Sequence, residues 1–197
     1  MNPKIAIVAG SSRTGSFNRR LAMELARHLA KTDVKLTILD LADYPLPIYD
    51  ADTEDENGVP NHALDLARQI ARQDGLLLVS PEYNSSVPPL LKNAVDWVSR
   101  VRRIDDRPVL PFKGLVVGLA SISTGQNGGM KGLEAWRPIL RSVGAEVITA
   151  QCSVPRAREA FDEEGALADD RIRMRFDALL ESLVDVSRSL ARTMAQD

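Results

Sequence analysis

Residues 75–100 read GLLLVSPEYNSSVPPLLKNAVDWVSR, and they join a short apolar run to a helical pattern through a polar loop. Residues 75–80 are apolar almost throughout, which is typical of a strand covered on both faces of a parallel sheet. Pro88 and Pro89 suit the first turn of a helix. The apolar residues that follow recur at helical spacing on one side: Leu90, Leu91, Ala94, Val95 and Val98. The stretch predicts a strand, a loop and a helix in succession.

The same alternation runs through the rest of the chain. Apolar runs predict strands at residues 4–9, 34–41, 75–80, 114–122 and 146–152. Helices are expected from Ser16, over 61–74, after residue 88, through Val143 and from about Asp169, with a Pro- and Asp-rich loop running through Pro60. Five strand-helix alternations predict a three-layer α/β fold with a parallel sheet. The length favours the flavodoxin-like strand order 2-1-3-4-5, as one domain over residues 1–197.

Composition excludes several classes of protein. The 197 residues carry a net charge of -2, so no basic surplus argues for binding nucleic acid or an anionic membrane. No apolar run approaches the roughly 18 residues of a membrane span. The first residues, MNPKIAIVAG, lack the pattern of a signal peptide, and the one cysteine, Cys152, cannot form an internal disulfide. We therefore expect a cytoplasmic protein.

In such a sheet, ligands bind beyond the carboxyl ends of the strands, where the strand order reverses. Three loops then matter: GSSRTGSFN (10–18), PEYNSS (81–86) and STGQNGG (123–129). They are also the most polar loops of the chain. The topology and the composition thus predict the same site.

The first loop has neither the G-x-G-x-x-G pattern nor P-loop spacing. It offers one cation, Arg13, an amide from Asn18, and the N-terminus of the next helix, which attracts anions. Its hydroxyls come from Ser11, Ser12, Thr14 and Ser16. This set suits the terminal phosphate of a mononucleotide such as FMN. The alternative is that Ser16 merely caps the helix while its neighbours form a turn.

The second loop suits a flat heteroaromatic ring. Pro81 stiffens the exit from the strand, Tyr83 offers an apolar face, and Asn84 can donate and accept hydrogen bonds. Backbone N–H groups there can meet the polar edge of an isoalloxazine. The alternative is a tight turn with a partly buried tyrosine.

At these separations, GSSRTGSFNRRLA, PEYNSSVPPLLKNAVDWVSR and STGQNGG resemble the NADPH-dependent FMN reductase family, which includes bacterial quinone, chromate and azo-dye reductases. The resemblance spans essentially the whole chain, including LPIYDAD (46–52) and FDEEGAL (161–167). It implies three groups of FMN-binding residues: Ser11, Arg13, Ser16, Phe17 and Asn18 at the phosphate; Pro81, Glu82, Tyr83, Asn84 and Ser85 at the ring; and Ser123, Thr124 and Gly125 on its other side. One departure is Pro88-Pro89-Leu90, because relatives usually carry small residues after the first proline.

The resemblance also implies an activity. Non-covalently bound FMN takes hydride from NAD(P)H and passes electrons to a small acceptor, such as a quinone, free flavin, an azo compound or chromate, in two steps. No acid-base pair is needed, so no protein residue is assigned as catalytic. Two alternatives stay open, a one-electron carrier of the flavodoxin type and a flavin-binding module without catalysis. A homodimer or homotetramer is expected, with the helix at Lys92–Arg100 and its Trp97 near the subunit contact.

Other conspicuous residues receive structural roles. His28 and His62 lie on separate predicted helices, so no metal site is expected. Cys152 is expected to be buried and inert, and Trp136 and Phe176 to lie in the core. The basic cluster is interpreted as a solvated face or an interface, or as a site for the 2′-phosphate of NADPH: Arg100, Arg102, Arg103 and Arg107.

Overall fold

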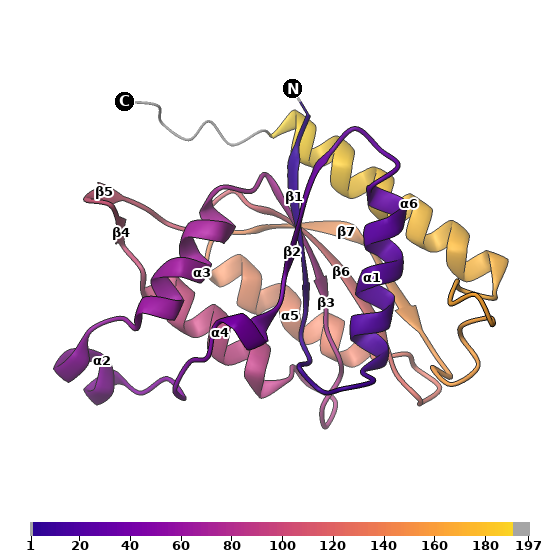
Figure 1. The fold of residues 1–197 in the computed structure, drawn as a ribbon, viewed down its shortest axis with the longest axis horizontal. Coiled ribbons are helices and arrows are strands. Elements are labelled where there is room, and N and C mark those ends of the chain that lie inside the picture. Colours follow the sequence, from indigo (N-terminus) through magenta and orange to yellow (C-terminus); the bar gives the residue numbers. More distant parts are fainter. Residues whose placement is uncertain (1, 191–197) are drawn as a thin grey trace.

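A computed structural model describes residues 2–190 and shows a parallel sheet between two layers of helices (Figure 1). The sheet consists of β1 (Lys4–Ala9), β2 (Lys35–Leu39), β3 (Gly75–Val79), β6 (Val116–Ile122) and β7 (Glu146–Val154). Its order is β2-β1-β3-β6-β7, and every neighbouring pair is parallel. Counted within this sheet, the order is 2-1-3-4-5, which confirms the predicted topology.

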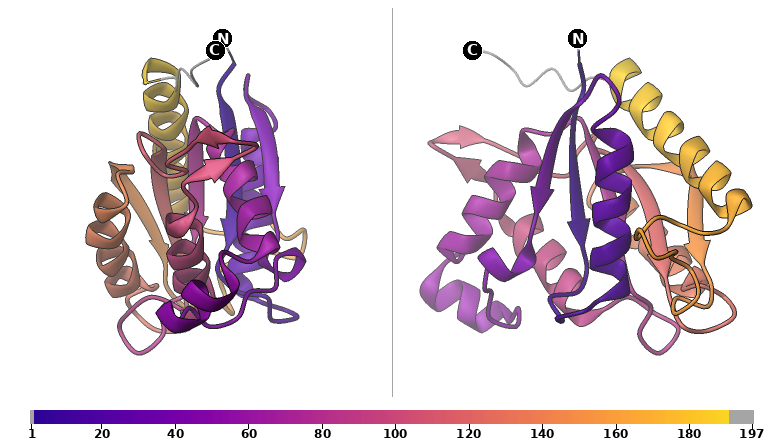
Figure 2. Two further views of the ribbon diagram at one scale, coloured as in Figure 1. Left: turned by 90° about the vertical axis from the view of Figure 1, so that its left-hand side faces the viewer. Right: turned by 45° about the vertical axis from the view of Figure 1, so that its right-hand side comes forward.

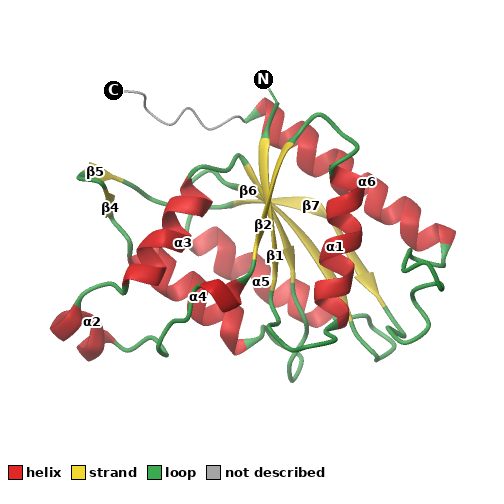
Figure 3. Ribbon diagram, viewed as in Figure 1, coloured by secondary structure: helices red, strands yellow, loops and turns green. Residues whose placement is uncertain are grey.

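Six α-helices and one 3₁₀ turn accompany the sheet within the described residues. They are α1 (Phe17–Leu29), the turn η1 (Leu41–Asp43), α2 (Ala51–Asn57), α3 (Asn61–Ala71), α4 (Pro89–Arg100), α5 (Met130–Ser142) and α6 (Asp170–Ser189). A small antiparallel hairpin, β4 (Arg103–Ile104) and β5 (Arg107–Pro108), follows α4. Figure 3 shows the strands enclosed by helices on both sides.

Alternate strand residues build two cores. Ile5 and Ile7 of β1 pack into one core together with α1 and α6, whereas Ala6 and Val8 face the other core, which α3, α4 and α5 cover. Figure 2 shows, in further views, the helices that cover the two faces of the sheet. All residues of β3 and β6 are buried, which explains their unbroken apolar sequences, since both faces are covered.

The sequence prediction was wrong in one segment. The expected loop through Pro60 contains α2, which buries no residue and so lacks the apolar period that marks a helix. The sequence feature that could have indicated this helix is its N-cap residue, Asp50, whose side chain accepts the Thr53 N–H at 3.0 Å. The hairpin β4–β5 was not predicted either, because its strands are only two residues long.

Helix α4 turns the predicted side to the core, because Leu91, Ala94, Val95 and Val98 are buried, and Leu90 is the one member of the predicted set that is not. Leu90 is 40% exposed, whereas Trp97 is fully buried and donates its indole N–H to the Pro47 carbonyl at 2.8 Å. Pro89 opens the helix, as predicted. Trp97 therefore contributes to the core of its own chain rather than to an exposed surface.

Other core predictions are confirmed. Trp136 and Phe176 are buried, and Asp169 caps α6. Strand β7 continues to Val154, beyond the predicted end, and Cys152 is buried within it. Burial raises the pKa of the Cys152 thiol to about 12.

Candidate flavin site

The three polar loops lie together at the carboxyl edge of the sheet, as predicted. Gly10 donates its N–H to the Val79 carbonyl at 2.9 Å, and a Cβ there would lie 3.1 Å from the Pro81 ring and 2.8 Å from Leu91. The first loop therefore contacts the second. The third loop joins them at Gly129, where a Cβ would meet Ser121 at 2.0 Å and Glu82 at 3.6 Å. Only glycine fits positions this close to a neighbouring loop.

The first loop presents unpaired donors. Residues 12–15 are exposed, and among the described residues no protein partner is found for their backbone N–H groups. Arg13 is exposed and forms no ion pair within residues 2–190. Ser16 does cap α1, since its hydroxyl accepts the Arg19 N–H at 3.4 Å, whereas the question whether it only caps the helix stays open. Ser16 is 5% exposed, and a contact of its hydroxyl proton with a ligand remains a prediction.

Asn18 has a role that the sequence did not show. It is 5% exposed, donates its amide N–H to the Ile122 carbonyl at 3.0 Å and accepts the Ile122 N–H at 3.2 Å. The side chain thus holds the start of α1 against the end of β6. Direct contact of Asn18 with a phosphate remains a prediction.

The second loop forms a tight hairpin. Tyr83 and Ser86 exchange two backbone hydrogen bonds, at 3.0 and 2.9 Å, across a two-residue turn. Both turn residues are left-handed, Asn84 at φ 51° and Ser85 at φ 61°, as a type I′ turn requires. The predicted turn is confirmed, but Tyr83 is 48% exposed. For Ser85 this conformation costs on the order of 1 kcal/mol, and such strain is concentrated at functional sites.

Glu82 serves α5. Its carboxylate accepts the Gly132 N–H at 3.0 Å, in the first turn of that helix, where a negative charge is favourable. Gly132 packs closely against the hairpin, because a Cβ would lie 3.2 Å from the Ser86 carbonyl oxygen and the hairpin would have to shift slightly to admit it. The carboxylate of Glu82 is therefore engaged in anchoring the hairpin, and a contact with a ring remains a prediction.

The third loop is braced by the chain that follows β7. Ser123 accepts the Gly125 N–H on its hydroxyl at 3.2 Å and the Ala157 N–H on its carbonyl at 3.0 Å. Arg156, left-handed at φ 48°, donates its N–H to the Gly125 carbonyl at 3.3 Å. Thr124 and Gly125 are exposed. The bracing residues follow a predicted strand and carry no sequence pattern that identifies them.

The basic cluster lies away from this site. Arg100 donates its Nε–H to both Glu54 oxygens, at 2.7 and 2.9 Å, and Tyr49 donates its hydroxyl to Glu54 at 3.0 Å. The hydrogen bond from Arg100 lowers the pKa of Glu54, and the Glu54 carboxylate raises that of Tyr49. The hairpin at the far end of α4 carries Arg103 and Arg107, opposite the three loops (Figure 1). The interpretation of the cluster as a solvated face or an interface and its alternative role at the 2′-phosphate of NADPH both remain predictions.

The described residues also bear on metal binding and on membrane insertion. In residues 2–190, no group of three or more His, Cys, Asp or Glu side chains is arranged to hold a metal ion. In that same part of the chain, no helix has the length and apolar character that crossing a bilayer requires.

Comparison with known families decides the assignment. Residues 3–159 match the family described as NADPH-dependent FMN reductase. The chain belongs to the NADPH-dependent FMN reductase family. As a member, it is an oxidoreductase that uses FMN as its cofactor and NAD(P)H as its electron donor.

Individual relatives agree with this assignment. A quinone reductase from Escherichia coli (strain K12) is 39% identical over 151 residues, covering 75% of this chain and 76% of that protein. An NAD(P)H-dependent FMN reductase from Pseudomonas aeruginosa is 30% identical over 181 residues, covering 91% and 92%. The solved structure of the flavoenzyme FerB, an NAD(P)H:(acceptor) oxidoreductase from Paracoccus denitrificans, superposes with a TM-score of 0.75 at 25% identity, over 95% of this chain and 98% of that one.

Proposed function

We propose that this FMN reductase passes its electrons to quinones and holds FMN between the three loops at the carboxyl edge of the sheet. The observation that carries the proposal is the convergence there of unpaired backbone donors and exposed polar side chains. Bound FMN supplies the hydride-accepting ring. The protein binds it, orients it and leaves one face open.

The first loop suits the FMN phosphate. The exposed N–H groups of residues 12–15, the Arg13 guanidinium and the hydroxyls of Ser11 and Ser16 are all donors, as a phosphate requires. Phe17, half-buried at the start of α1, closes the apolar side of this loop. In this proposal Asn18 positions the loop by its bonds to Ile122.

The hairpin and the third loop suit the ring. Asn84 and Ser85 present N–H groups that have no partner among the described residues. Tyr83 offers an exposed aromatic face, and Thr124 and Gly125 lie exposed on the third loop. Pro81 and Glu82 hold the hairpin in place, against Gly10 and Gly132.

Quinones are favoured as acceptors because several relatives bear that name. Besides the E. coli quinone reductase, a 2-hydroxy-1,4-benzoquinone reductase from Burkholderia is 47% identical over 97 residues, which is 49% of this chain and 50% of that protein. Quinones are flat and can stack on an open ring face. The exposed Pro89 and Leu90 follow the hairpin and offer an apolar border to such a substrate.

We also propose a cytoplasmic homo-oligomer whose subunits meet near the start of α4. Leu90 on this helix is 40% exposed, and Ile48, in the loop that α4 holds through Asn93 and Trp97, is 87% exposed. Large apolar side chains exposed in one region mark interaction surfaces. A subunit contact there would border the flavin site.

The test is spectroscopic. The purified protein is incubated with FMN, desalted, and its visible spectrum recorded, after which NADPH and then benzoquinone are added without oxygen. Bound flavin that NADPH bleaches and benzoquinone restores supports the proposal. Bleaching without recovery on benzoquinone overturns the choice of acceptor, and recovery is then tested with chromate, azo dyes and free flavin. Loss of flavin on desalting overturns the assignment of the three loops.

A further inference from the structure

A second hollow lies at the amino edge of the sheet, opposite the flavin site. It has a volume of about 470 Å³ and is formed by the end of α4, the segment before β6 and the turn after α5. Volumes of 300–1,000 Å³ are typical of sites for small molecules. None of the residues assigned to FMN contributes to it.

The lining of the hollow combines apolar surface with positive charge. Leu110, Pro111, Phe112 and Val143 supply the apolar part. The only charged residues that line it are Arg102 and Lys113, both exposed and without an ion pair to any described residue. Nearby hydroxyls are directed elsewhere, since Ser99 and Ser142 donate to carbonyls of their own helices at 2.7 Å. Arg102 also helps to lower the pKa of Glu54, which does not line the hollow, and a lining with two cations and no carboxylate favours an anion.

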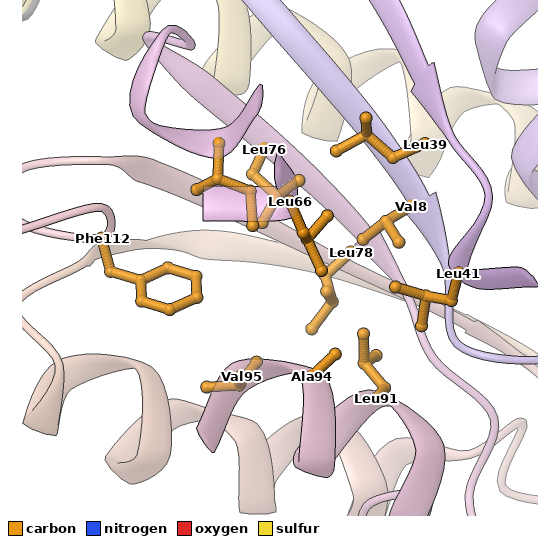
Figure 4. Close-up of a pocket in the computed structure, with 11 residues that line it drawn as sticks. Val8, Leu39, Leu41, Leu66, Leu76, Leu78, Leu91, Ala94, Val95 and Phe112 are labelled. Atoms are coloured by element: carbon orange, nitrogen blue, oxygen red, sulfur yellow. The ribbon is translucent and has the colours of Figure 1, made fainter. Parts of the chain in front are cut away.

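Phe112 forms a partition between this hollow and the protein interior. It is 3% exposed and also lines an apolar cavity of about 20 Å³ between β1, β3, α3 and α4 (Figure 4). In Figure 4 its ring lies at one end of the cavity, opposite Val8 and Leu41. The Phe112 ring is therefore buried beneath the hollow, and the apolar surface that the hollow offers comes from Leu110, which is 44% exposed, and from the partly exposed Val143.

We propose that the hollow binds a hydrophobic carboxylate, with its anionic group between Arg102 and Lys113 and its apolar body on Leu110 and Val143. An arginine and a lysine recognise a carboxylate by charge-assisted hydrogen bonds, and an apolar wall contributes through the area it removes from water. Because the hollow and the flavin loops lie at opposite edges of the sheet, binding is independent of the bound cofactor.

Titration calorimetry of the FMN-saturated protein with 2-naphthoate tests this inference. We expect one site per chain, with 2-naphthamide, the neutral analogue, binding about tenfold more weakly. The double variant Arg102→Gln, Lys113→Gln is expected to lose about tenfold in affinity for 2-naphthoate and to bind the amide as before. The matched control is Lys31→Gln, Arg171→Gln, which removes two exposed cations elsewhere and is expected to bind like the unaltered protein.

Several results overturn the inference. They are an absence of binding at millimolar 2-naphthoate, equal binding by the amide, an unchanged affinity in the Arg102 and Lys113 variant, or an equal loss in the control. The flavin absorption spectrum is recorded in parallel, because naphthoate stacked on FMN would shift it. Binding that shifts the flavin spectrum and ignores Arg102 and Lys113 places the ligand at the flavin and also overturns the inference. Reduction by NADPH tests the proposed function separately.

Discussion

At the residue scale, the Asn18 side chain joins two of the three loops through its amide. Its two hydrogen bonds to Ile122 satisfy a backbone N–H and a carbonyl at the end of β6, just before the third loop. The amide therefore pairs with the edge of β6 as the backbone of a further strand would, and it fixes the distance between the first loop and the third loop. In the proposed site, we expect a residue in this position to influence cofactor affinity through the placement of the two loops.

We expect Asn18→Ala to lower the free energy of unfolding by about 2–4 kcal/mol, because it leaves two buried backbone groups of Ile122 without partners. Urea denaturation with and without FMN measures this loss. Asn57→Ala serves as the control, since it removes one exposed hydrogen bond at 3.3 Å and is expected to change stability by under about 0.5 kcal/mol. Equal stability of Asn18→Ala and the parent would show that the bridge to Ile122 contributes nothing.

Cys152 gives a second prediction at this scale. Burial raises its thiol pKa to about 12, so at pH 8 only about one molecule in ten thousand carries a thiolate. We expect a thiol reagent to label the folded protein no faster than the protein unfolds, and to label it rapidly in urea. Because the folded pKa is raised, the associated stability is complete below the ordinary value of 9.0 and is lost as the pH rises towards 12. Rapid labelling of the folded protein at pH 8 would contradict this burial.

At the scale of elements, Glu82 couples the ring loop to α5. Gly129, at the N-cap of α5, has no side chain, and the Glu82 carboxylate from another loop meets the first turn of the helix instead. A helix end and a binding loop thus stabilise each other. The sequence did not show this link, because a glutamate after a strand is equally compatible with a ligand contact and with a cap on a distant helix.

We expect Glu82→Ala to cost about 1 kcal/mol in unfolding free energy, because α5 loses its cap, and to weaken FMN binding because the hairpin loses its anchor. Glu82→Gln keeps an acceptor and should lose less than half of either quantity. Chemical denaturation and FMN titration measure the two effects. Glu181→Ala, an exposed carboxylate on α6, is the matched control. If Glu82→Ala behaves like the control, the cap is unimportant.

Helix α2 is held to α4 by a polar cluster rather than by burial. Glu54 accepts hydrogen bonds from Arg100 and Tyr49, and the Tyr49 ring meets Trp97 edge-on at 5.0 Å. The pKa of Glu54 is lowered, so the contact is intact above the ordinary value of 4.5 and is lost as the pH falls through the lower folded value. Hydrogen exchange, corrected for intrinsic rates, should show α2 loosening below pH 4.5. In Glu54→Gln we expect faster exchange at neutral pH and no such transition.

At the scale of the whole molecule, the sheet was predictable because β3 and β6 are buried on both faces and therefore have unbroken apolar sequences. The parallel strand order then followed from the alternation of strands and helices and from the length of the chain. This order predicted that the three loops lie together. Helix α2 and the β4–β5 hairpin could not be predicted, because neither buries a face and so neither shows apolar residues at a regular spacing in its sequence. For the site, the loops were predictable, but the partners of Asn18 and Glu82 were not, because those partners are backbone groups distant in sequence.

The assembly of subunits gives the last prediction. Leu90 is exposed on α4 beside the ring loop, so an arginine there would place a charge in the proposed subunit contact, where a buried unpaired charge is strongly unfavourable. We expect Leu90→Arg to shift the protein to monomers in light scattering after gel filtration. Met174→Arg, at an exposed position on α6 outside the proposed contact, should leave the oligomer intact. A monomeric parent protein would overturn the proposed oligomer, and an oligomer disrupted by Met174→Arg and not by Leu90→Arg would place the contact away from the start of α4. Because the proposed contact borders the flavin site, FMN affinity is expected to fall along with the oligomer in Leu90→Arg alone.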